Sequence, residues 1–317
     1  MKEGQASKTA ENVAAFRALE SLKPTNERIL DDHYAVQFLS GTYSIIAKFR
    51  FLLSSRLLVK TTDWYISNFI PGGINFDVVK AKYIEDYLSQ CIEDGIEQLV
   101  LLGAGYDSRA FRFNALEEKV KVFEVDHPDS QRVKKEKVKR IFGSLPDHVI
   151  YVSFDFDHGK LDEKLFENGY SNNLKTLFIW EGVIYYLTAE AVDETLAFIA
   201  NNSGEGSSVI FDYAFESFVT GGVKEAEKMI RKLAQLGEPL TFGIKEGTVE
   251  EFLTKRGFCQ VKQMNAQSLD NTYFKGTNRK SSPCWAVAHA TVKPRERIPL
   301  LSIPFYPATK SQPLPIK

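Results

Sequence analysis

The chain has 317 residues, of which 44% are hydrophobic and 26% charged, and its formal net charge is −1. These proportions are those of a globular protein with enough apolar residues for a core, and the balanced charge argues against a nucleic-acid partner. Three widely separated cysteines, a polar N-terminus without a signal-peptide core, and no apolar run of about 18 residues predict a cytoplasmic protein without a membrane-spanning segment.

The N-terminal region is predicted to be helical. Val13, Phe16 and Leu19 recur at helical spacing, and a second apolar, aromatic and basic stretch with helical spacing runs from 43 to 70. Residues 1–73 are therefore interpreted as a helical cap beside the main domain. A basic amphipathic helix on a membrane surface is the alternative, but apolar lid helices are the simpler explanation and no membrane partner is expected.

The middle of the chain alternates between strands and helices. A helix over 76–94 ends at Gly95, and strands are predicted at 98–103, 121–126, 148–154, 176–181 and 207–213. Helices are predicted at 107–113, 129–142 and 188–201. This alternation indicates a parallel sheet that is covered by helices on both faces.

The C-terminal part completes the predicted sheet. A helical insert is expected at 223–236, followed by strands near 258–264 and 284–292 with only an irregular connection between them. Such a connection favours an antiparallel pair over a crossover helix. The tail from Pro294 carries six prolines and is expected to be extended, either docked or loose.

These elements predict an α/β fold: a twisted, seven-stranded, mostly parallel sheet with an antiparallel last strand, helices on both faces and an N-terminal helical cap. The chain is interpreted as one domain. Its parts are the cap (1–73), a ligand-binding core (74–213), a helical lid insert (214–247), the C-terminal strands (248–293) and the proline-rich tail (294–317).

The stretch VLLGAGYDSRAFRF, residues 100–113, resembles part of a nucleotide-binding turn. Gly103 and Gly105 let the backbone turn sharply and approach a ligand closely. Ser108 stands where the dinucleotide pattern has its third glycine, and Asp107 would repel a pyrophosphate at the helix start. The turn therefore favours a ligand with positive groups, or it is a strand–helix turn in which Asp107 only caps the helix.

Two further acidic motifs follow predicted strands. In VFEVD, Asp126 lies at the strand's carboxyl end, where an acid can accept both ribose hydroxyls of an adenosine; the alternative is an N-cap for the helix at 129–142. In VSFDFD, Asp155 can accept the amino group of adenine while Phe156 packs near the ring. An ordinary turn aspartate is equally consistent with that second pattern.

Two charged residues stand in apolar surroundings. Glu181, in FIWEGVIYYL, is costly to bury unless it is paired with a ligand ammonium or sulfonium, or with a nearby Arg or Lys. Lys80 heads an apolar stripe of the 76–94 helix, so it either extends to water or meets an anionic group of the ligand.

Other chemistries find little support in the sequence. The basic run 132–140 reads as a solvated helix face, because a nucleic-acid patch would also carry interleaved aromatics. The five histidines have no ligand spacing, so no metal site is predicted, and no GxSxG elbow occurs.

Taken together, the motifs TAENVAAFRALES with DDHYA, LLGAGYDSRAFRF, FEVDHP, DFD and WEGVIYYL resemble the leucine carboxyl methyltransferase family. The similarity is to its bacterial branch, which includes polyketide-type O-methyltransferases, and it covers roughly residues 7–292. This resemblance implies a class I methyltransferase fold with a helical cap and S-adenosyl-L-methionine as the cofactor.

The resemblance also implies roles for residues of this sequence. Gly103 falls on the first glycine of the cofactor loop, Asp126 on the ribose-binding acid, Asp155 with Phe156 on the adenine-binding pair, and Glu181 on the carboxylate of the fourth strand.

The implied site departs from the family at the methionine carboxylate. Lys80 falls where the family usually has the arginine that holds this carboxylate, and lysine lacks the bidentate guanidinium fork. Arg17 falls near a second basic family position, in a looser alignment.

The methyl acceptor is not encoded by a readable motif. A carboxylate, with a solution pKa of about 4, needs no base at pH 7, whereas a phenol with a pKa of about 10 benefits from one. Because the sequence shows no convincing base, a small-molecule carboxylate is favoured over a hydroxyl. Some family members methylate a protein C-terminus, but this chain shows no added repeat domain that would recruit a large partner.

Several alternatives stay open at this point. Tyr185 and Tyr186 either line the acceptor pocket or belong to the core. The Asn/Asp-Pro-Pro-Tyr loop of many amino-group methyltransferases is absent from the sequence. A nicotinamide-dependent oxidoreductase and a non-catalytic binding protein of the same fold are the competing functions.

Overall fold

The computed structural model describes residues 8–41, 72–156, 158–221, 230, 231, 234 and 239–294. Three predicted features lie outside these residues: the helical segment at 43–70, most of the helical insert at 223–236, and the proline-rich tail after Pro294. The predicted division of the chain into cap, core, insert and tail therefore stays a prediction.

A single seven-stranded sheet forms the centre of the protein, with the strand order β3-β2-β1-β4-β5-β7-β6. The strands are β1 (Gln98–Leu102), β2 (Lys121–Asp126), β3 (Val149–Ser153), β4 (Thr176–Trp180), β5 (Ser208–Ala214), β6 (Phe258–Asn265) and β7 (Trp285–Val292). Neighbouring strands from β1 to β5 pair in parallel, whereas β7 is antiparallel to both β5 and β6. The predicted sheet with a reversed last strand is confirmed.

The strand order reverses direction beside β1. The chain builds β2 and β3 on one side of β1 and then crosses to add β4 and β5 on the other. In such sheets a crevice opens at the carboxyl ends of the strands where the order switches, which here is between β1 and β4.

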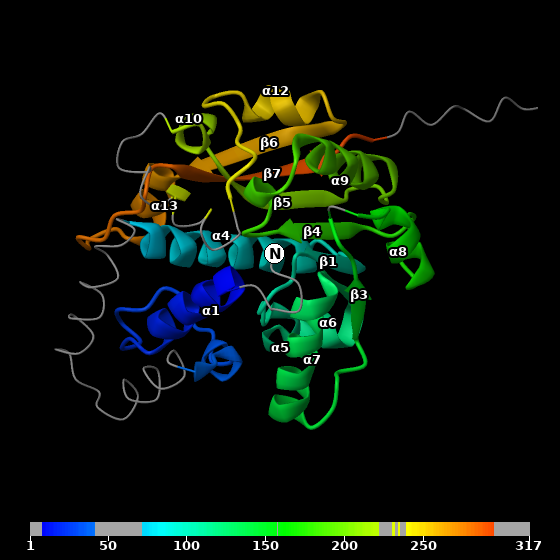
Figure 1. Cartoon of the computed structure of the whole chain (residues 1–317), viewed down its shortest axis with the longest axis horizontal. Coiled ribbons are helices and arrows are strands. Elements are labelled where there is room, and N and C mark those ends of the chain that lie inside the picture. The colour runs from blue at the N-terminus through cyan, green and yellow to red at the C-terminus, as the bar shows by residue number, and fades with distance from the viewer. Residues whose placement is uncertain are drawn as a thin grey trace, which may run out of the picture.

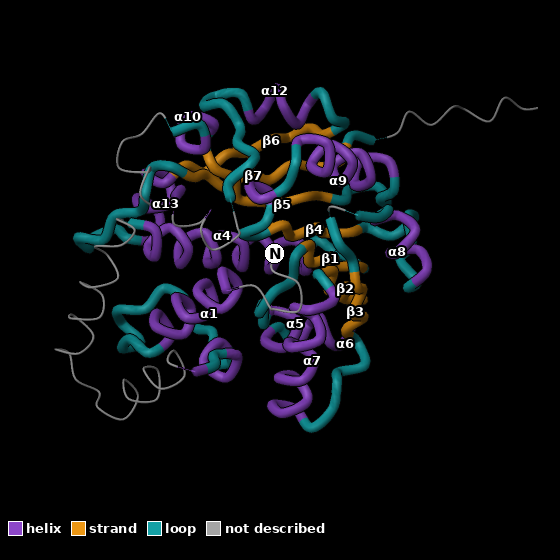
Figure 2. The backbone as a smooth tube through the Cα atoms, viewed as in Figure 1, coloured by secondary structure: helices purple, strands orange, loops and turns teal. Residues whose placement is uncertain are grey.

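Helices surround the sheet (Figures 1 and 2). They are α1 (Lys8–Ser21), α4 (Gly73–Glu93), α5 (Arg109–Arg112), α6 (Asn114–Lys119), α7 (Pro128–Phe142), α8 (Leu161–Glu167), α9 (Ala189–Asn201), α10 (Glu216–Val219), α12 (Val249–Thr254) and α13 (Ala266–Tyr273), with short 3₁₀ turns η1 (Ala35–Phe38) and η2 (Ile184–Tyr186). Side chains of α4, α6 and α13 pack on one face of the sheet, and side chains of α8, α9 and α12 pack on the other.

The alternation of strand side chains explains these two cores. On β1, Leu99 and Leu101 join the core under α4, whereas Val100 and Leu102 join the core under α9. All five residues of β1 are buried, as expected for a central parallel strand that is covered on both faces.

The connection between β6 and β7 was predicted to be irregular, and that prediction is wrong. It contains α13, whose first turn is capped by Asn265: the side-chain oxygen accepts a hydrogen bond of 2.9 Å from the backbone N–H of Ser268. Leu269 of this helix is fully buried. The two flanking strands are nevertheless antiparallel, because β6 and β7 pair directly.

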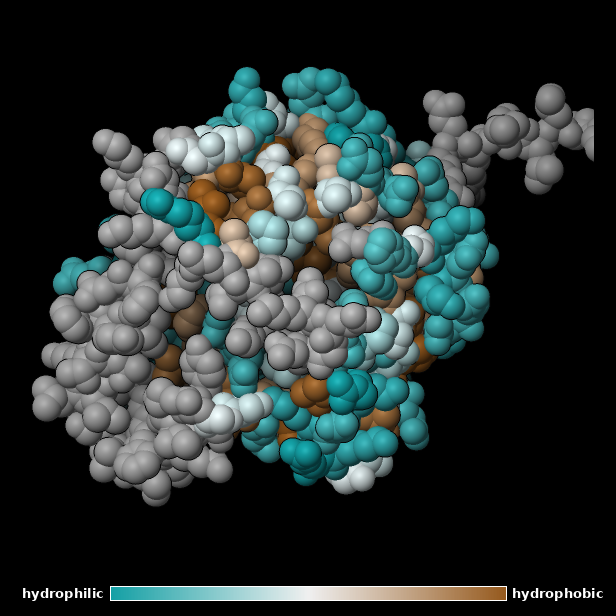
Figure 3. All heavy atoms as spheres, viewed as in Figure 1, coloured by the Kyte–Doolittle hydropathy of each residue, from teal (hydrophilic) through white to brown (hydrophobic). Residues whose placement is uncertain are grey.

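The surface seen in Figure 3 is mostly hydrophilic over α8 and α9. Charged residues of α8 and of the position before it form exposed i,i+3 pairs, Lys160 with Glu163 and Lys164 with Glu167. Among the helices that the structure describes, none combines the length and the apolar character that crossing a bilayer requires.

The first part of the predicted cap lies against the loop that follows β1. Ala14, Ala15 and Ala18 of α1 pack with Phe38 and with Tyr106 of that loop. Small alanine side chains allow this close approach. An added Cβ at Gly105, which has a φ of +44°, would lie 3.2 Å from the Cβ of Ala10.

Gly103 ends β1 in a conformation that few other residues adopt. Its φ is +69°, and its N–H donates a hydrogen bond of 2.8 Å to the carbonyl of Val125. An added Cβ would lie 2.3 Å from Cγ2 of Val183, which follows β4. Both the backbone angle and the space therefore require glycine at this turn.

We expect Gly103→Ala to lower the free energy of unfolding by about 3 to 4 kcal/mol, because a steric clash adds to the strain of the left-handed backbone. Gly95 has a φ of +78° and no atom within 4 Å of an added Cβ. The matched variant Gly95→Ala should therefore cost only about 1 to 2 kcal/mol. Urea unfolding of both variants measures the difference, and equal losses would contradict the packing argument.

Candidate cofactor site

A cavity of about 750 Å³ opens at the carboxyl ends of β1, β2 and β4 and is also lined by α1. Seven of the residues predicted to contact the cofactor line it: Arg17, Gly103, Gly105, Asp126, Asp155, Phe156 and Glu181. Lys80 is the one predicted contact that is not among its lining residues. The structure thus brings together residues that are up to 164 positions apart, from 17 to 181.

Asp126 lies at the end of β2 and holds the neighbouring glycine loop in place. Its Oδ2 accepts a hydrogen bond of 2.7 Å from the backbone N–H of Gly105, and its Oδ1 accepts one of 2.7 Å from that of His127. Burial raises the pKa of Asp126, although both backbone N–H groups oppose this effect. Each carboxylate oxygen retains a second lone pair, so the residue can still accept the hydroxyls of a ribose.

Asp126 is not the N-cap of the following helix. His127 takes that position, and its Nδ1 accepts a hydrogen bond of 3.3 Å from the backbone N–H of Asp129. Pro128 occupies the first turn of α7, where its missing N–H costs nothing.

Asp155 and Phe156 lie just after β3 and line the same cavity. The ring of Phe156 is stacked near Trp180, with 6.5 Å between ring centroids and 18° between their planes. Asp155 forms a backbone bridge with His158 and lies 3.8 Å from Nε2 of His127. A fixed aromatic ring beside a carboxylate can bind the face and the amino group of an adenine.

Glu181 is paired with an arginine that the sequence reasoning did not name. Nη2 of Arg109 donates to Oε2 of Glu181 at 2.7 Å, and Nη1 donates to Oδ2 of Asp107 at 2.7 Å. Asp107 also accepts the backbone N–H of Arg109 at 2.8 Å, so it serves the start of α5 as well as the cavity. The sequence left an arginine or lysine partner open, but RAFR contains two arginines and only the fold shows which one reaches Glu181.

The second carboxylate oxygen of Glu181 has no such partner. Oε1 is buried and finds no hydrogen-bond donor within the part of the chain that the structure describes. Burial would raise the pKa of Glu181, but the charges of Arg109, Lys80 and Arg17 hold it below its ordinary value. A buried, charged oxygen without a donor, in a wall of the cavity, fits a ligand ammonium group.

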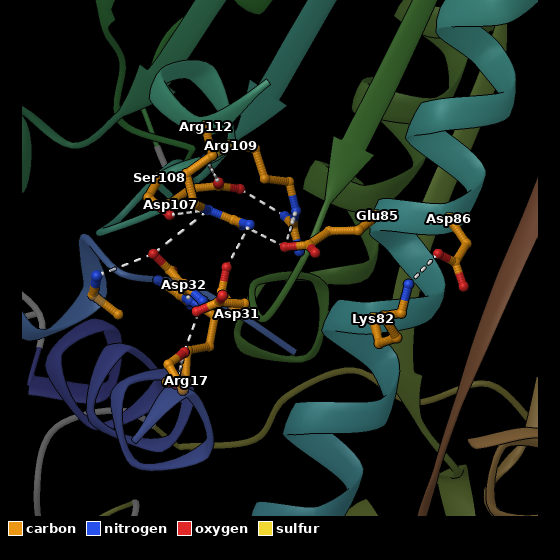
Figure 4. A network of polar contacts seen from close by, with 12 residues as sticks. Arg17, Asp31, Asp32, Lys82, Glu85, Asp86, Asp107, Ser108, Arg109 and Arg112 are labelled. Carbon is orange, nitrogen blue, oxygen red and sulfur yellow. Dashed lines mark hydrogen bonds and ion pairs between the residues drawn. The ribbon is translucent and has the colours of Figure 1, made fainter. Parts of the chain in front are cut away.

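Arg17 places a positive charge at the cavity from α1. Its Nε donates to Oδ2 of Asp32 at 2.9 Å, and its Nη2 donates to the carbonyl of Tyr106 at 2.6 Å. Asp32 also lies 3.5 Å from Nε of Arg112, which in turn pairs with Glu85 of α4. Figure 4 shows these charged side chains converging between α1, α4 and the loop after β1. The network ties α1 to α4, to α5 and to the loop after β1 through buried ion pairs and the hydrogen bond to Tyr106.

Lys80 lies behind the cavity wall. Its Nζ is 2.8 Å from Oδ2 of Asp212 and 2.8 Å from Oδ1 of Asp77, and only 1% of the side chain is exposed. Burial would lower the pKa of Lys80, but Asp212 and Asp77 raise it well above its ordinary value, so the amine is charged. Its predicted contact with the methionine carboxylate stays a prediction.

Tyr185 and Tyr186 separate in the structure. Tyr186 lines the cavity, whereas Tyr185 is 8% exposed and belongs to the core under α9. The backbone carbonyl of Tyr185 accepts the N–H of Thr241 at 2.9 Å, which holds the chain after the insert against η2.

A sequence model of leucine carboxyl methyltransferases matches residues 10–200, which contain the whole cavity wall except Thr9 and Pro239. The chain belongs to the leucine carboxyl methyltransferase family. The prediction from the sequence motifs is confirmed, and the cofactor of this methyltransferase is S-adenosyl-L-methionine.

Two relatives and one solved structure illustrate the match. The methyltransferase is 33% identical over 207 residues to "Putative S-adenosyl-L-methionine-dependent methyltransferase YktD" of Bacillus subtilis (strain 168), covering 65% of this chain and 67% of the relative. It is 28% identical over 232 residues to a "Putative S-adenosyl-L-methionine-dependent methyltransferase" of Mycolicibacterium paratuberculosis (strain ATCC BAA-968 / K-10), covering 72% of this chain and 70% of the relative.

The fold comparison agrees with this family. A crystal structure of "a putative methyltransferase from Thermobifida fusca YX" superposes with a TM-score of 0.54 at 11% sequence identity, covering 92% of this chain and 97% of that one. The predicted class I methyltransferase fold is confirmed. The competing oxidoreductase and scaffold functions gain no support from these comparisons.

The residues of the cavity fit S-adenosylmethionine. The cavity offers acceptors for ribose hydroxyls at Asp126, an aromatic ring at Phe156, a buried carboxylate oxygen without a donor at Glu181, and a cation at Arg17. The individual contacts remain predictions that binding measurements on variants test.

We expect Asp126→Asn to weaken binding of S-adenosylhomocysteine by about a hundredfold or more, because two charge-assisted hydrogen bonds to the ribose are lost. Titration calorimetry measures the affinity. Asp193→Asn, at an exposed position on α9 outside the cavity wall, is the control and should bind as the parent chain does. Unchanged binding by the Asp126 variant would show that the ribose assignment is wrong.

Proposed function

We propose that this methyltransferase transfers the methyl group of S-adenosylmethionine to a carboxylate oxygen of a small molecule with an apolar body. The observation that carries the proposal is the composition of the cavity wall. Its polar residues belong largely to the strand ends and the arginine network. An apolar lining is supplied by Val13 of α1, by Val183, Tyr186 and Leu187 after β4, and by Pro239 in the chain between α10 and α12.

The polar residues divide naturally between the two ends of the cofactor. Asp126, with Asp155 and Phe156, is suited to hold the adenosine end. The Oε1 atom of Glu181 is suited to accept the ammonium group, and Arg17 to hold the carboxylate of the methionine end. This placement leaves the apolar lining for the acceptor.

The carboxylates of the described wall each have at least one partner, and its two histidines lie away from the apolar lining. Arg109 binds Asp107 and Glu181, and backbone N–H groups bind Asp126. His127 and His158 lie beside Asp155, on the side assigned to the adenosine. An acceptor that arrives ionised needs none of these groups as a base, which favours a carboxylate over a hydroxyl.

Bound S-adenosylmethionine supplies a methyl carbon activated by its sulfonium. In the transfer to a carboxylate, the carbon–sulfur bond breaks, its electron pair stays on sulfur, a carbon–oxygen bond forms, and no proton moves. The residues of the chain then have to align donor and acceptor in line and exclude water. Such positioning can contribute several kcal/mol to the lowering of the barrier, on the order of 7 or more in favourable cases.

The product decides between carboxylate and hydroxyl acceptors. We expect incubation with S-adenosylmethionine labelled in the methyl group and a panel of apolar carboxylic acids to give labelled methyl esters. Mild alkali hydrolyses an ester and releases volatile labelled methanol, whereas a methyl ether or a methylated amine keeps its label. A labelled product that survives alkali would contradict the carboxylate assignment. Labelling only of a protein's C-terminus would contradict the small-molecule assignment.

We expect Arg17→Gln to weaken binding of S-adenosylhomocysteine by about tenfold to a hundredfold, because a charged hydrogen bond to the carboxylate is lost. Binding of the same ligand without its carboxylate should change by less than about threefold, since no partner of Arg17 is present. Calorimetry with both ligands tests the assignment. Equal losses for both would show that Arg17 stabilises the cap and does not contact the carboxylate.

A further inference from the structure

Lys80 and Asp212 form a buried ion pair directly behind the residue assigned to the cofactor ammonium. Asp212 lies on β5 and is fully buried, and its Oδ2 is 2.8 Å from Nζ of Lys80. Its other oxygen, Oδ1, accepts a hydrogen bond of 2.6 Å from the backbone N–H of Gly182. The pair therefore connects α4, β5 and the loop after β4.

Gly182 follows Glu181 directly and lines the cavity. Its φ of +75° places the chain in the left-handed region, where it turns away from β4 toward η2. A backbone held at this point sets the direction in which the neighbouring Glu181 side chain extends. One hydrogen bond from Gly182 to a buried carboxylate is a strong constraint, because the acceptor is charged and shielded from water.

The amine of Lys80 is paired with two carboxylates of the protein. Two of its three N–H groups face Asp212 and Asp77, and the residue is not among those that line the cavity. Arg17, in contrast, lines the cavity directly. Arg17 is therefore the cation that lines the cavity, and Lys80 is the cation behind the cavity wall.

We propose that Lys80 acts as a positioning residue: by holding Asp212, it fixes Gly182 and so orients Glu181 toward the cofactor ammonium. This proposal rests on the proposed placement of the cofactor. It assigns Lys80 a role through Asp212 and Gly182, and not a contact with the methionine carboxylate.

The charge of Lys80 matters for this role. Burial raises the pKa of Asp212, and Lys80 and the N–H of Gly182 act against that rise. Without the lysine, Asp212 is a buried carboxylate that gains a proton more readily. A protonated carboxyl group is a weaker acceptor for the N–H of Gly182, so the loop after β4 is held less firmly.

Three ligands separate the two possible roles of Lys80. S-adenosylhomocysteine has both the carboxylate and the ammonium, its analogue without the carboxylate keeps only the ammonium, and methylthioadenosine lacks the whole amino-acid end. We expect Lys80→Met to weaken the binding of the first two ligands by the same factor, about tenfold. The binding of methylthioadenosine should weaken by less than about threefold.

The matched control is Lys82→Met, on the same helix. Lys82 forms a partly exposed ion pair with Asp86 on α4, as Figure 4 shows. Its replacement by methionine should leave the affinity for all three ligands within about twofold of that of the parent chain. Removal of a buried lysine also destabilises the fold, so Lys80→Gln serves as a milder variant that can still donate to Asp212. The comparison uses ratios between ligands, which a general loss of stability does not change.

The outcomes are distinct. If Lys80→Met and Lys80→Gln weaken the binding of S-adenosylhomocysteine but leave the affinity for the analogue without the carboxylate unchanged, Lys80 contacts the carboxylate and the proposal is overturned. An equal loss of affinity for all three ligands also overturns the proposal, because methylthioadenosine has no ammonium group for Glu181 to bind. If the parent chain binds none of the three ligands, the proposed placement of the cofactor fails first, and the positioning role fails with it.

Discussion

The site depends on the ion pairs of Arg109. Parallel strands that end side by side bring carboxylates together, and Asp107 and Glu181 would repel each other at the edge of the sheet without a shared cation. Arg109, 2% exposed, donates to both at 2.7 Å. Burying charges is costly unless they are paired and hydrogen-bonded, so this one guanidinium makes an acidic cavity compatible with a folded protein.

The same pairing leaves one atom available. Arg109 occupies Oε2 of Glu181 but not Oε1, which is buried without a donor in the described part of the chain. A glutamate that was fully satisfied by the protein would gain little from a ligand, and a glutamate with no partner would lose its charge on burial. The half-satisfied carboxylate is stable in the folded chain and still gains from a cationic ligand group. It is therefore the feature that most directly matches the methionine end of S-adenosylmethionine.

Backbone contacts give the site its shape. Gly103 passes close to Val183, Gly105 passes close to Ala10 of α1, and the N–H of Gly105 is held by Asp126. Each contact joins the loop after β1 to a different element. Helix α1, Asp126 and the loop after β4 are consequently positioned relative to one another by a few residues of a single turn.

The sequence alone determined the order of the strands, the reversed last strand, the family and the acidic residues Asp126, Asp155 and Glu181 of the cavity wall. These are local properties: alternating burial, glycines at strand ends and motif spacing are all visible in short stretches. The sequence analysis missed α6 and α8, which have only six and seven residues. It also missed α13, because its cap at Asn265 and its one central buried leucine lie in a segment without a strong helical period.

Only the tertiary structure decided which charges pair. Arg109 and Arg112 stand three residues apart in the same short motif, yet one reaches Glu181 and the other reaches Asp32 and Glu85. Lys80 and Arg17 were both suited by sequence to meet an anion, but one is enclosed by Asp212 and Asp77 and the other faces the cavity. Electrostatic pairing acts between elements that are distant in the chain and depends on distances of a few ångströms. Those distances follow from how the helices pack on the sheet, which the order of residues does not show.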